Sequence, residues 1–111
     1  MAYVPDCGDA VWLTFDPQSG HEQAGRRPAL VLSPQAYNAK TSLAIVCPIT
    51  NRQKGYPFEV LLRDASKVTG VILVDQIKSL DWRARDASLI EGVPIEVLTE
   101  VRLKLKALLG F

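Results

Sequence analysis

The sequence is poor in the residues and patterns that would assign a chemistry at first sight. It contains two cysteines, one histidine and one methionine, and its apolar runs are far shorter than the roughly 20 residues of a membrane helix. Cys7 and Cys47 allow one disulfide at most, and neither has neighbours at metal-ligand spacing. We therefore expect two reduced packing thiols, no metal and no cofactor. The beginning of the chain lacks a signal-peptide pattern, which predicts a cytoplasmic protein without membrane contact.

The 111 residues and the 48% apolar content predict one globular domain over residues 1–111. Short apolar runs separated by polar loops are typical of β-strands, and we expect strands at 9–15, 29–33, 43–49, 58–62, 71–74, 75–83 and 87–91. One segment, 94–109, has the periodicity of a helix. The sequence therefore predicts a mostly β fold, either a small barrel or a strongly curved sheet, with a C-terminal helix packed on it.

The predicted helix begins after Gly92-Val93 and ends near Gly110, with Pro94 at its first position. Apolar residues recur at a spacing of three to four and predict one buried stripe, formed by Ile95, Leu98, Val101, Leu105 and Leu108.

The loop Gly20–Pro28 is the most unusual stretch of the chain. It lies between two apolar strands and holds the sole histidine, a carboxylate, an amide and two guanidiniums within nine positions. Glycine and proline mark it as a loop, and loops on a strand scaffold commonly carry binding and catalytic groups. Its candidate functional residues are His21, Glu22, Gln23, Arg26 and Arg27. A single histidine in such a loop can also be a solvated side chain with no function.

Outside the helix the cations gather in or beside the loops, at Arg26, Arg27, Arg52, Lys54, Lys78, Arg83 and Arg85. Tyr56, Phe58 and Trp82 are interleaved with them. Cations beside aromatic rings suit a flexible polyanion whose bases can stack, such as single-stranded RNA. A solvated charged rim is an equally valid interpretation of a protein whose net charge is only +1.

Glu22, Arg27 and Thr50 form the catalytic candidate. RNA carries its own nucleophile, the ribose 2′-hydroxyl, so an enzyme that cuts it needs a base to take that proton, an acid for the leaving 5′-oxygen and positive charge for the phosphorane. A carboxylate and a guanidinium can supply these without a metal, and a threonine hydroxyl can hold a phosphate oxygen. Spacing alone does not bring these three residues together, and a surface glutamate with a turn threonine is the simpler alternative.

Three blocks of the sequence together resemble the MazF/PemK family of toxin endoribonucleases. The first runs from Gly20 to Ser33, the second covers Cys47–Thr50 and Lys54–Val60, and the third is Val74–Arg85. The blocks follow one another in the family's order over essentially the whole chain.

This resemblance implies an SH3-like, PemK-type small barrel of antiparallel strands that works as a homodimer. It implies a cytoplasmic, growth-inhibiting toxin that cuts single-stranded mRNA at a short sequence, without a metal, and leaves 2′,3′-cyclic phosphate and 5′-hydroxyl ends. It also implies a cognate antitoxin whose acidic, disordered tail occupies the RNA groove. DNA binding is expected only of the toxin–antitoxin complex.

Carried over to this chain, the resemblance implies that Glu22, Arg27 and Thr50 are catalytic. Ten further positions are expected to contact RNA: His21, Gln23, Arg26, Arg52, Lys54, Tyr56, Gln76, Lys78, Arg83 and Arg85. His21 lies where other members often carry serine, and Arg26 occupies a variable position.

Two other functions remain open at this point. One is a toxin of the same fold that inhibits a topoisomerase by binding it and cuts no RNA, because folds do not fix functions. The other is a barrel that binds RNA and leaves it intact. The loop Gly20–Pro28 favours the nuclease, because a pure binding module has no need of its mixture of acid, amide and guanidinium groups.

Overall fold

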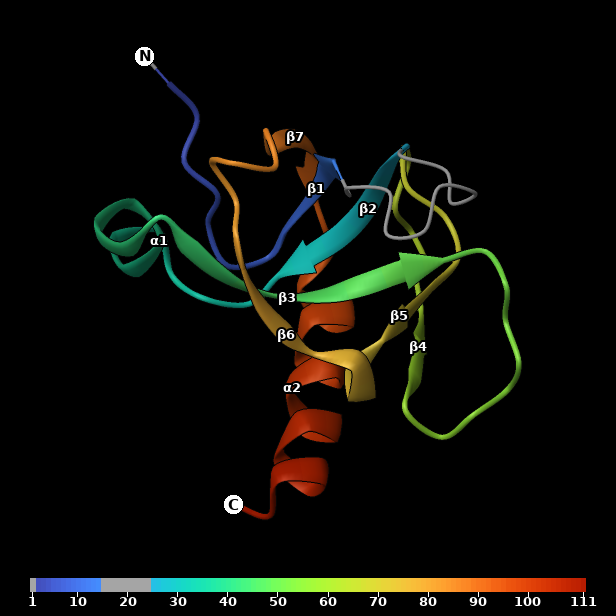
Figure 1. Ribbon diagram of the computed structural model, residues 1–111. Coiled ribbons are helices and arrows are strands. Elements are labelled where there is room, and N and C mark those ends of the chain that lie inside the picture. The colour runs from blue at the N-terminus through green and yellow to red at the C-terminus, as the bar shows by residue number, and fades with distance from the viewer. Residues whose placement is uncertain (1, 15–24) are drawn as a thin grey trace, which may run out of the picture.

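A computed structural model of the chain describes residues 2–14 and 25–111. Strand β3 runs across the whole molecule and the other elements are arranged around it (Figure 1). In chain order the elements are β1 (Asp9–Thr14), β2 (Arg26–Val31), α1 (Gln35–Thr41), β3 (Leu43–Thr50), β4 (Glu59–Leu61), β5 (Val71–Leu73), the 3₁₀ turn η1 (Val74–Gln76), β6 (Lys78–Asp81), β7 (Ser88–Gly92) and α2 (Ile95–Leu109).

All the strand pairs described are antiparallel, and the strands follow the order β4-β5-β3-β2-β1-β7. Strand β6 adds to the same edge of β3 as β5, so that β6 pairs with the first half of β3 and β5 with its end. The mostly β, antiparallel fold with a C-terminal helix is thus confirmed. Within the described residues the sheet does not close into a barrel, because its terminal strands β4 and β7 are not paired with each other.

Pro48 lies inside β3, where a missing amide hydrogen would normally break a ladder. On one edge of β3 the pairing with β6 ends at Val46 and the pairing with β5 begins at Ile49. The proline therefore occupies the one place in the strand where that edge changes partner.

Two apolar clusters lie on opposite faces of the sheet. Alternate residues of a strand point to opposite faces, so neighbours such as Leu30 and Val31 contribute to different clusters. The larger cluster includes residues of strands β4 and β5 and joins the sheet to α2. Its largest fully buried side chains are Leu30, Val60, Ile72, Val74, Val97 and Val101. The smaller cluster lies between β1, β2, β3 and β6 and is built from Val11, Leu13, Ala29, Val31, Ala44, Val46, Leu80 and Trp82.

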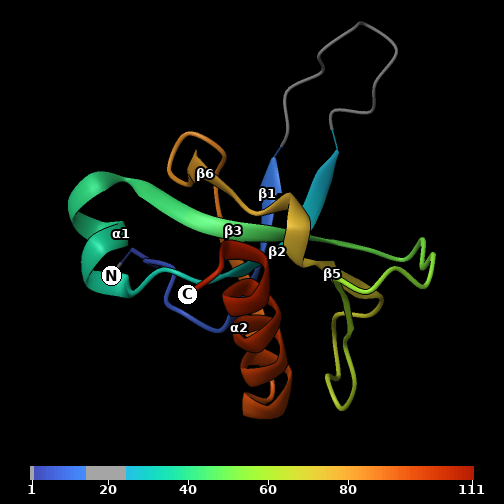
Figure 2. The ribbon, with the colours of Figure 1, turned by 90° about the horizontal axis from the view of Figure 1, so that it is seen from below.

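Helix α2 packs against one side of the sheet, as the views in Figures 1 and 2 show. It buries Val97, Leu98 and Val101, whereas Ile95 is 62% exposed and Leu108 is 39% exposed. The predicted helix is confirmed, but the predicted buried stripe is wrong at both ends. In the first turn of α2, Val97 and not Ile95 points toward the core, and in the last turn Leu108 is exposed. Among the described residues, no helix has the length and apolar composition needed to cross a membrane.

Asn38 is a fully buried polar residue that joins three segments. Its side-chain amide donates hydrogen bonds to the carbonyls of Pro5 (2.8 Å) and Ser33 (3.0 Å), and its oxygen accepts one from the Ser33 hydroxyl (2.6 Å). The indole of Trp82 donates to the Asn38 backbone carbonyl at 2.9 Å. The amino-terminal segment, α1 and the turn after β6 are thereby held at the start of β3.

We expect Asn38→Ala to lower the free energy of unfolding by about 3 kcal/mol, because it leaves buried carbonyl and hydroxyl groups without partners. Denaturant unfolding measures the loss. Lys40→Ala, an exposed change in the same helix, is the control and should stay within about 0.5 kcal/mol of wild type. Equal stabilities of the two variants would contradict the role assigned to Asn38.

Candidate functional site

The two adjacent arginines lie in strand β2 and not in the loop that the sequence predicts for them. Arg26 is paired with Thr14, and Arg27 with Leu13, across the ladder between β1 and β2. Pro28, predicted as the last residue of the loop, is an interior position of β2 opposite Trp12. Since neighbouring residues of a strand point to opposite faces, Arg26 and Arg27 serve different sides of the sheet.

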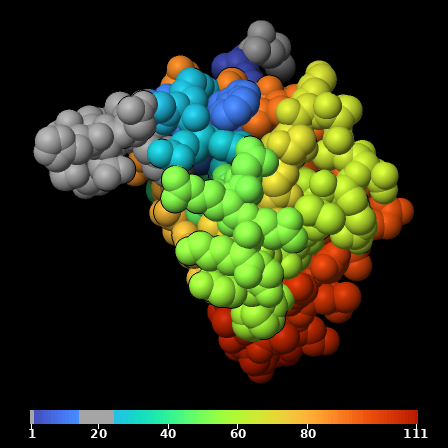
Figure 3. All heavy atoms as spheres, turned by 90° about the vertical axis from the view of Figure 1, so that its right-hand side faces the viewer, coloured from blue at the N-terminus to red at the C-terminus, as the bar shows by residue number. Residues whose placement is uncertain are grey.

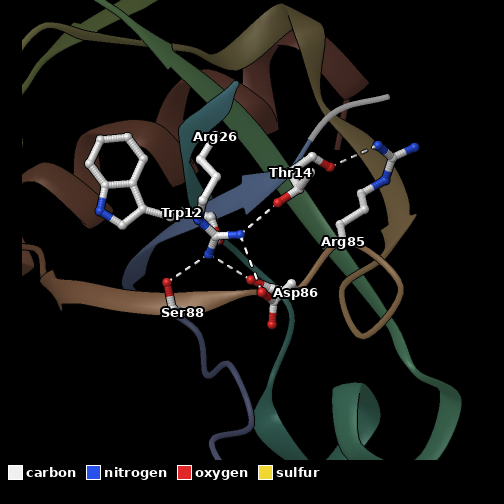
Figure 4. Close-up of polar contacts among 6 residues, drawn as sticks. All are labelled: Trp12, Thr14, Arg26, Arg85, Asp86 and Ser88. Atoms are coloured by element: carbon white, nitrogen blue, oxygen red, sulfur yellow. Dashed lines mark hydrogen bonds and ion pairs between the residues drawn. The ribbon is translucent and has the colours of Figure 1, made fainter. Parts of the chain in front are cut away.

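The guanidinium of Arg26 is held by its own protein. It donates hydrogen bonds to the Thr14 hydroxyl (2.6 Å), the Ser88 hydroxyl (2.8 Å) and the backbone carbonyls of Asp86 (2.6 Å) and Trp12 (3.3 Å), as Figure 4 shows. The Asp86 carboxylate adds an ion pair at 3.7 Å. Arg26 therefore joins β1, β2 and β7, and the geometry gives this predicted RNA contact a structural role.

Arg85, in the turn between β6 and β7, lies beside Thr14, the last residue of β1. Its backbone carbonyl accepts a hydrogen bond from the Thr14 amide at 2.9 Å, and its guanidinium donates to the Thr14 carbonyl at 3.4 Å. It thus borders the same strand end as Arg26 (Figure 4).

Arg27 and Thr50 share one edge of the sheet through the register of β2 and β3. The ladder pairs Leu30 with Cys47 and Ala29 with Pro48. The ladder ends at the Ala29–Pro48 pair. Arg27 and Thr50 each lie two residues beyond that pair, so the alternation of side chains places both on the same face of the sheet. Arg27 is exposed and Thr50 is half-buried. Two of the three predicted catalytic residues thereby lie on one face of the sheet, at neighbouring ends of β2 and β3.

The Thr50 hydroxyl is oriented by the chain that follows it. Its oxygen accepts a hydrogen bond from the backbone N–H of Arg52 at 3.1 Å. The hydroxyl hydrogen takes no part in that bond, so Thr50 can donate it to an oxygen of a bound molecule.

A hollow of about 220 Å³ continues from Thr50 along the loop between β3 and β4. Figure 3 shows this loop, in green, beside the start of β2, in cyan. Five predicted site residues line the hollow, together with three that the sequence did not suggest: Thr50, Arg52, Lys54, Tyr56 and Gln76, with Glu59, Leu73 and Asp75. The lining holds two cations, Arg52 and Lys54, and two carboxylates, Glu59 and Asp75. Because these charges balance, binding of an anion here depends on further cations at the border of the hollow.

Tyr56 provides an aromatic surface in this hollow. Its side chain is 58% exposed, and the Lys54 ammonium lies 5.8 Å from the centre of its ring. An exposed ring with a cation beside it can stack a nucleobase while the charge attracts a phosphate.

Two predicted cations lie away from this hollow. Lys78 belongs to β6 and is paired with Val46 in the middle of β3. Arg83 stacks on the Trp82 ring at 4.7 Å and donates to the Ala39 carbonyl of α1 at 3.3 Å, so it lies at the start of β3, whereas Thr50 is at its end. His21, Glu22 and Gln23 lie outside the described residues.

Gly70 lies against the end of β3, and no sequence pattern singled it out. Its φ is +110°, and a Cβ added to it would lie 2.3 Å from the Thr50 carbonyl oxygen and 2.9 Å from the Asn51 side chain. The close approach of this backbone to the end of β3 fixes where Thr50 lies, and only glycine permits it.

We expect Gly70→Ala to displace Thr50 and Asn51 and to lower any activity that depends on Thr50 by at least about tenfold, because small misplacements of reacting groups are costly. Gly110→Ala, another glycine with positive φ but with open space around it, is the control for backbone strain. Equal activity in both variants would show that the Gly70 contact does not position the site.

Glu91 of β7 fastens the segment that leads to Gly70. Its carboxylate accepts backbone hydrogen bonds from Lys67 (2.7 Å), Val68 (2.9 Å) and Ser66 (3.2 Å), and one from the Ser66 hydroxyl (2.9 Å). These donors, the Lys67 N–H first among them, lower the pKa of Glu91 from 4.5 to about 2.

Because its pKa is lower in the folded chain, Glu91 stabilises the fold above about pH 4.5, and the contribution is lost as the pH falls toward 2. Glu91→Gln should therefore lower the melting temperature most near neutral pH, with a difference from wild type that shrinks between about pH 5 and pH 2. Thermal unfolding across this range measures it, with the exposed Glu96→Gln as control. A difference that is constant with pH would contradict the assignment.

The cysteines are free thiols, as expected. Burial, with a smaller contribution from Asp75, raises the pKa of Cys47 to about 12, so this thiol stays protonated. The partly buried Cys7 accepts a hydrogen bond from Arg102 of α2 at 3.0 Å.

The chain is similar to known proteins over nearly all its length. Residues 6–109 match the family described as PemK-like, MazF-like toxins of type II toxin–antitoxin systems. The endoribonuclease toxin MazF of Escherichia coli K12 is 50% identical over 108 residues, which cover 97% of this chain and 96% of that protein. The endoribonuclease toxin ChpB of the same strain is 45% identical, with 90% of each protein covered.

Solved structures agree with this. MazF in a MazE–MazF crystal structure from Deinococcus radiodurans superposes with a TM-score of 0.94 at 59% identity, covering 99% of each chain. A crystal structure of MazF from the same organism gives a TM-score of 0.88 at 59% identity, with 99% of this chain and 100% of that chain covered.

Proposed function

This chain belongs to the family of PemK-like, MazF-like toxins of type II toxin–antitoxin systems, and from that membership we propose that it is an endoribonuclease toxin that cuts single-stranded mRNA in the cytoplasm. The observation that supports the proposal is that Arg27 and Thr50 share one face of the sheet and that Thr50 lines a hollow with an exposed aromatic ring and two cations. The whole chain, 1–111, acts as one toxin domain.

In the proposed reaction Glu22 accepts the proton of a ribose 2′-hydroxyl, whose oxygen attacks the adjacent phosphorus. The bond to the 5′-oxygen then breaks and this oxygen takes a proton from water, while Glu22 returns its own proton to the solvent. The products are a 2′,3′-cyclic phosphate and a 5′-hydroxyl. Arg27 stabilises the negative charge that builds up on the phosphorane, since a guanidinium does not readily give up a proton. Thr50 donates its hydroxyl hydrogen to a phosphate oxygen. No step in this scheme calls for a metal or a cofactor.

Substrate recognition is assigned to the hollow beside Thr50. A base stacks on Tyr56 while Arg52 and Lys54 neutralise phosphates, and Gln76 contacts base edges. Lys78 and Arg85 extend the positive surface outside the hollow. His21 and Gln23 contact RNA next to Glu22.

We further propose that the toxin is a homodimer and that a MazE-like antitoxin inhibits it, as the MazE–MazF pair of D. radiodurans suggests by its presence in one crystal. An acidic antitoxin tail would compete with RNA for the same cations, because both are flexible polyanions. DNA binding belongs to the toxin–antitoxin complex.

The test is incubation of the purified protein with a long RNA in EDTA. We expect cleavage at discrete sites, and Arg27→Ala should reduce the rate by about a hundredfold to a thousandfold, as loss of a group that stabilises transition-state charge does in comparable sites. Mapping the 5′ ends of the products gives the recognition sequence.

The matched control is Arg63→Ala, which removes another exposed arginine, one whose partner is Glu100 of α2. It should cut RNA as wild type does. Random degradation, or activity that survives Arg27→Ala in a folded protein, would contradict the proposed mechanism. RNA that is bound but never cut would favour a non-catalytic RNA-binding protein. Inhibition of a topoisomerase without RNA cleavage would favour the same-fold toxin that acts by protein binding.

A further inference from the structure

The loop 51–58 is closed by a single carboxylate. Both oxygens of Glu59, the first residue of β4, accept a hydrogen bond from the backbone N–H of Lys54, at 3.2 and 3.1 Å, and one oxygen also accepts from the N–H of Gly55 at 2.9 Å. Gly55 has a φ of +78°, the left-handed conformation that turns the loop back toward β4. The carboxylate thus supplies the partners that the turning backbone lacks.

A lysine holds the other side of the same loop. The Lys104 ammonium, on α2, donates to the backbone carbonyls of Pro57 at 2.5 Å and Glu59 at 3.1 Å. Its position is in turn set by Glu100, 3.9 Å away and one helical turn earlier. The loop therefore has a negative anchor from β4 and a positive anchor from α2.

These anchors engage backbone groups and leave the loop's functional side chains facing outward. Tyr56 is exposed, and Arg52, Lys54 and Tyr56 all line the hollow beside Thr50. Although Glu59 also borders the hollow, its oxygens are directed to backbone amides. Its role there is to shape the loop.

We propose that Glu59 and Lys104 are positioning residues for RNA recognition, which hold the loop 51–58 in its binding conformation before substrate arrives. The inference rests on the proposed function. An unanchored loop would pay the entropy of ordering when RNA binds, and so bind more weakly. The reacting groups Arg27 and Thr50 lie on strands β2 and β3. The anchors hold Lys54, Gly55 and Pro57, farther along the loop than Arg52, whose N–H orients the Thr50 hydroxyl. The anchors therefore set KM and leave kcat nearly unchanged.

The experiment compares Glu59→Gln and Lys104→Met with wild type in steady-state cleavage of one RNA oligonucleotide. A glutamine presents one acceptor oxygen in place of two, and a methionine has no donor. We expect KM to rise about tenfold in each variant with kcat within about twofold. Lys104→Arg keeps the charge and the donors and should restore KM to within about threefold of wild type.

Glu96→Gln and Lys106→Met are the controls, since they remove the same charges from exposed positions of α2. Both should keep the wild-type KM. An unchanged KM in Glu59→Gln and Lys104→Met, or an equal fall of kcat and kcat/KM, would overturn the proposal.

Amide hydrogen exchange provides a readout that needs no RNA. In Glu59→Gln the amides of Lys54 and Gly55 should exchange about tenfold faster, while those of β3 remain as protected as in wild type. Unchanged exchange at these two amides would overturn the anchor itself. If exchange rises but the wild-type protein cuts no RNA, the proposed function fails and the anchor stands. If exchange rises and KM does not, the positioning role fails while the nuclease assignment stands.

Discussion

The hydrogen bonds of β3 are the interaction on which the rest of the structure depends. This strand pairs with β2 along one edge and with both β6 and β5 along the other, and apolar clusters cover its two faces. Its first residues meet the Asn38 network and its last residue is Thr50. A strand held on both edges and both faces has little freedom to move, so the groups at its end are rigidly placed.

The alternation of side chains along a strand separates the work of the two adjacent arginines. Arg26 faces β7 and uses its donors on Thr14, Ser88 and backbone carbonyls. Arg27 points to the opposite face, the one that also carries Thr50. A single residue of register shift would exchange these roles. The two arginines are the first two residues of β2, so the register of the sheet determines which face each side chain occupies.

Two carboxylates accept hydrogen bonds from the backbone amides of the loops around the end of β3. Glu59 accepts the amides of the loop 51–58, and Glu91 accepts those of 66–68. Both loops have backbone donors without strand partners, and a fixed carboxylate satisfies several of them at once. The second loop ends at Gly70, which contacts Thr50, so a charge on β7 contributes to the position of a hydroxyl on β3.

The sequence by itself determined most of the strands, the C-terminal helix and the candidate functional residues. Its apolar runs predict the strands, its three-to-four spacing predicts α2, and the blocks around Arg27, Thr50 and Gln76 indicate the family, because these are local properties. The tertiary structure alone decided that β2 begins at Arg26, that Val97 and not Ile95 is buried, and that Gly70, Glu59 and Glu91 shape the site. Those outcomes depend on strand register and on contacts between residues far apart in the chain, which no local pattern encodes.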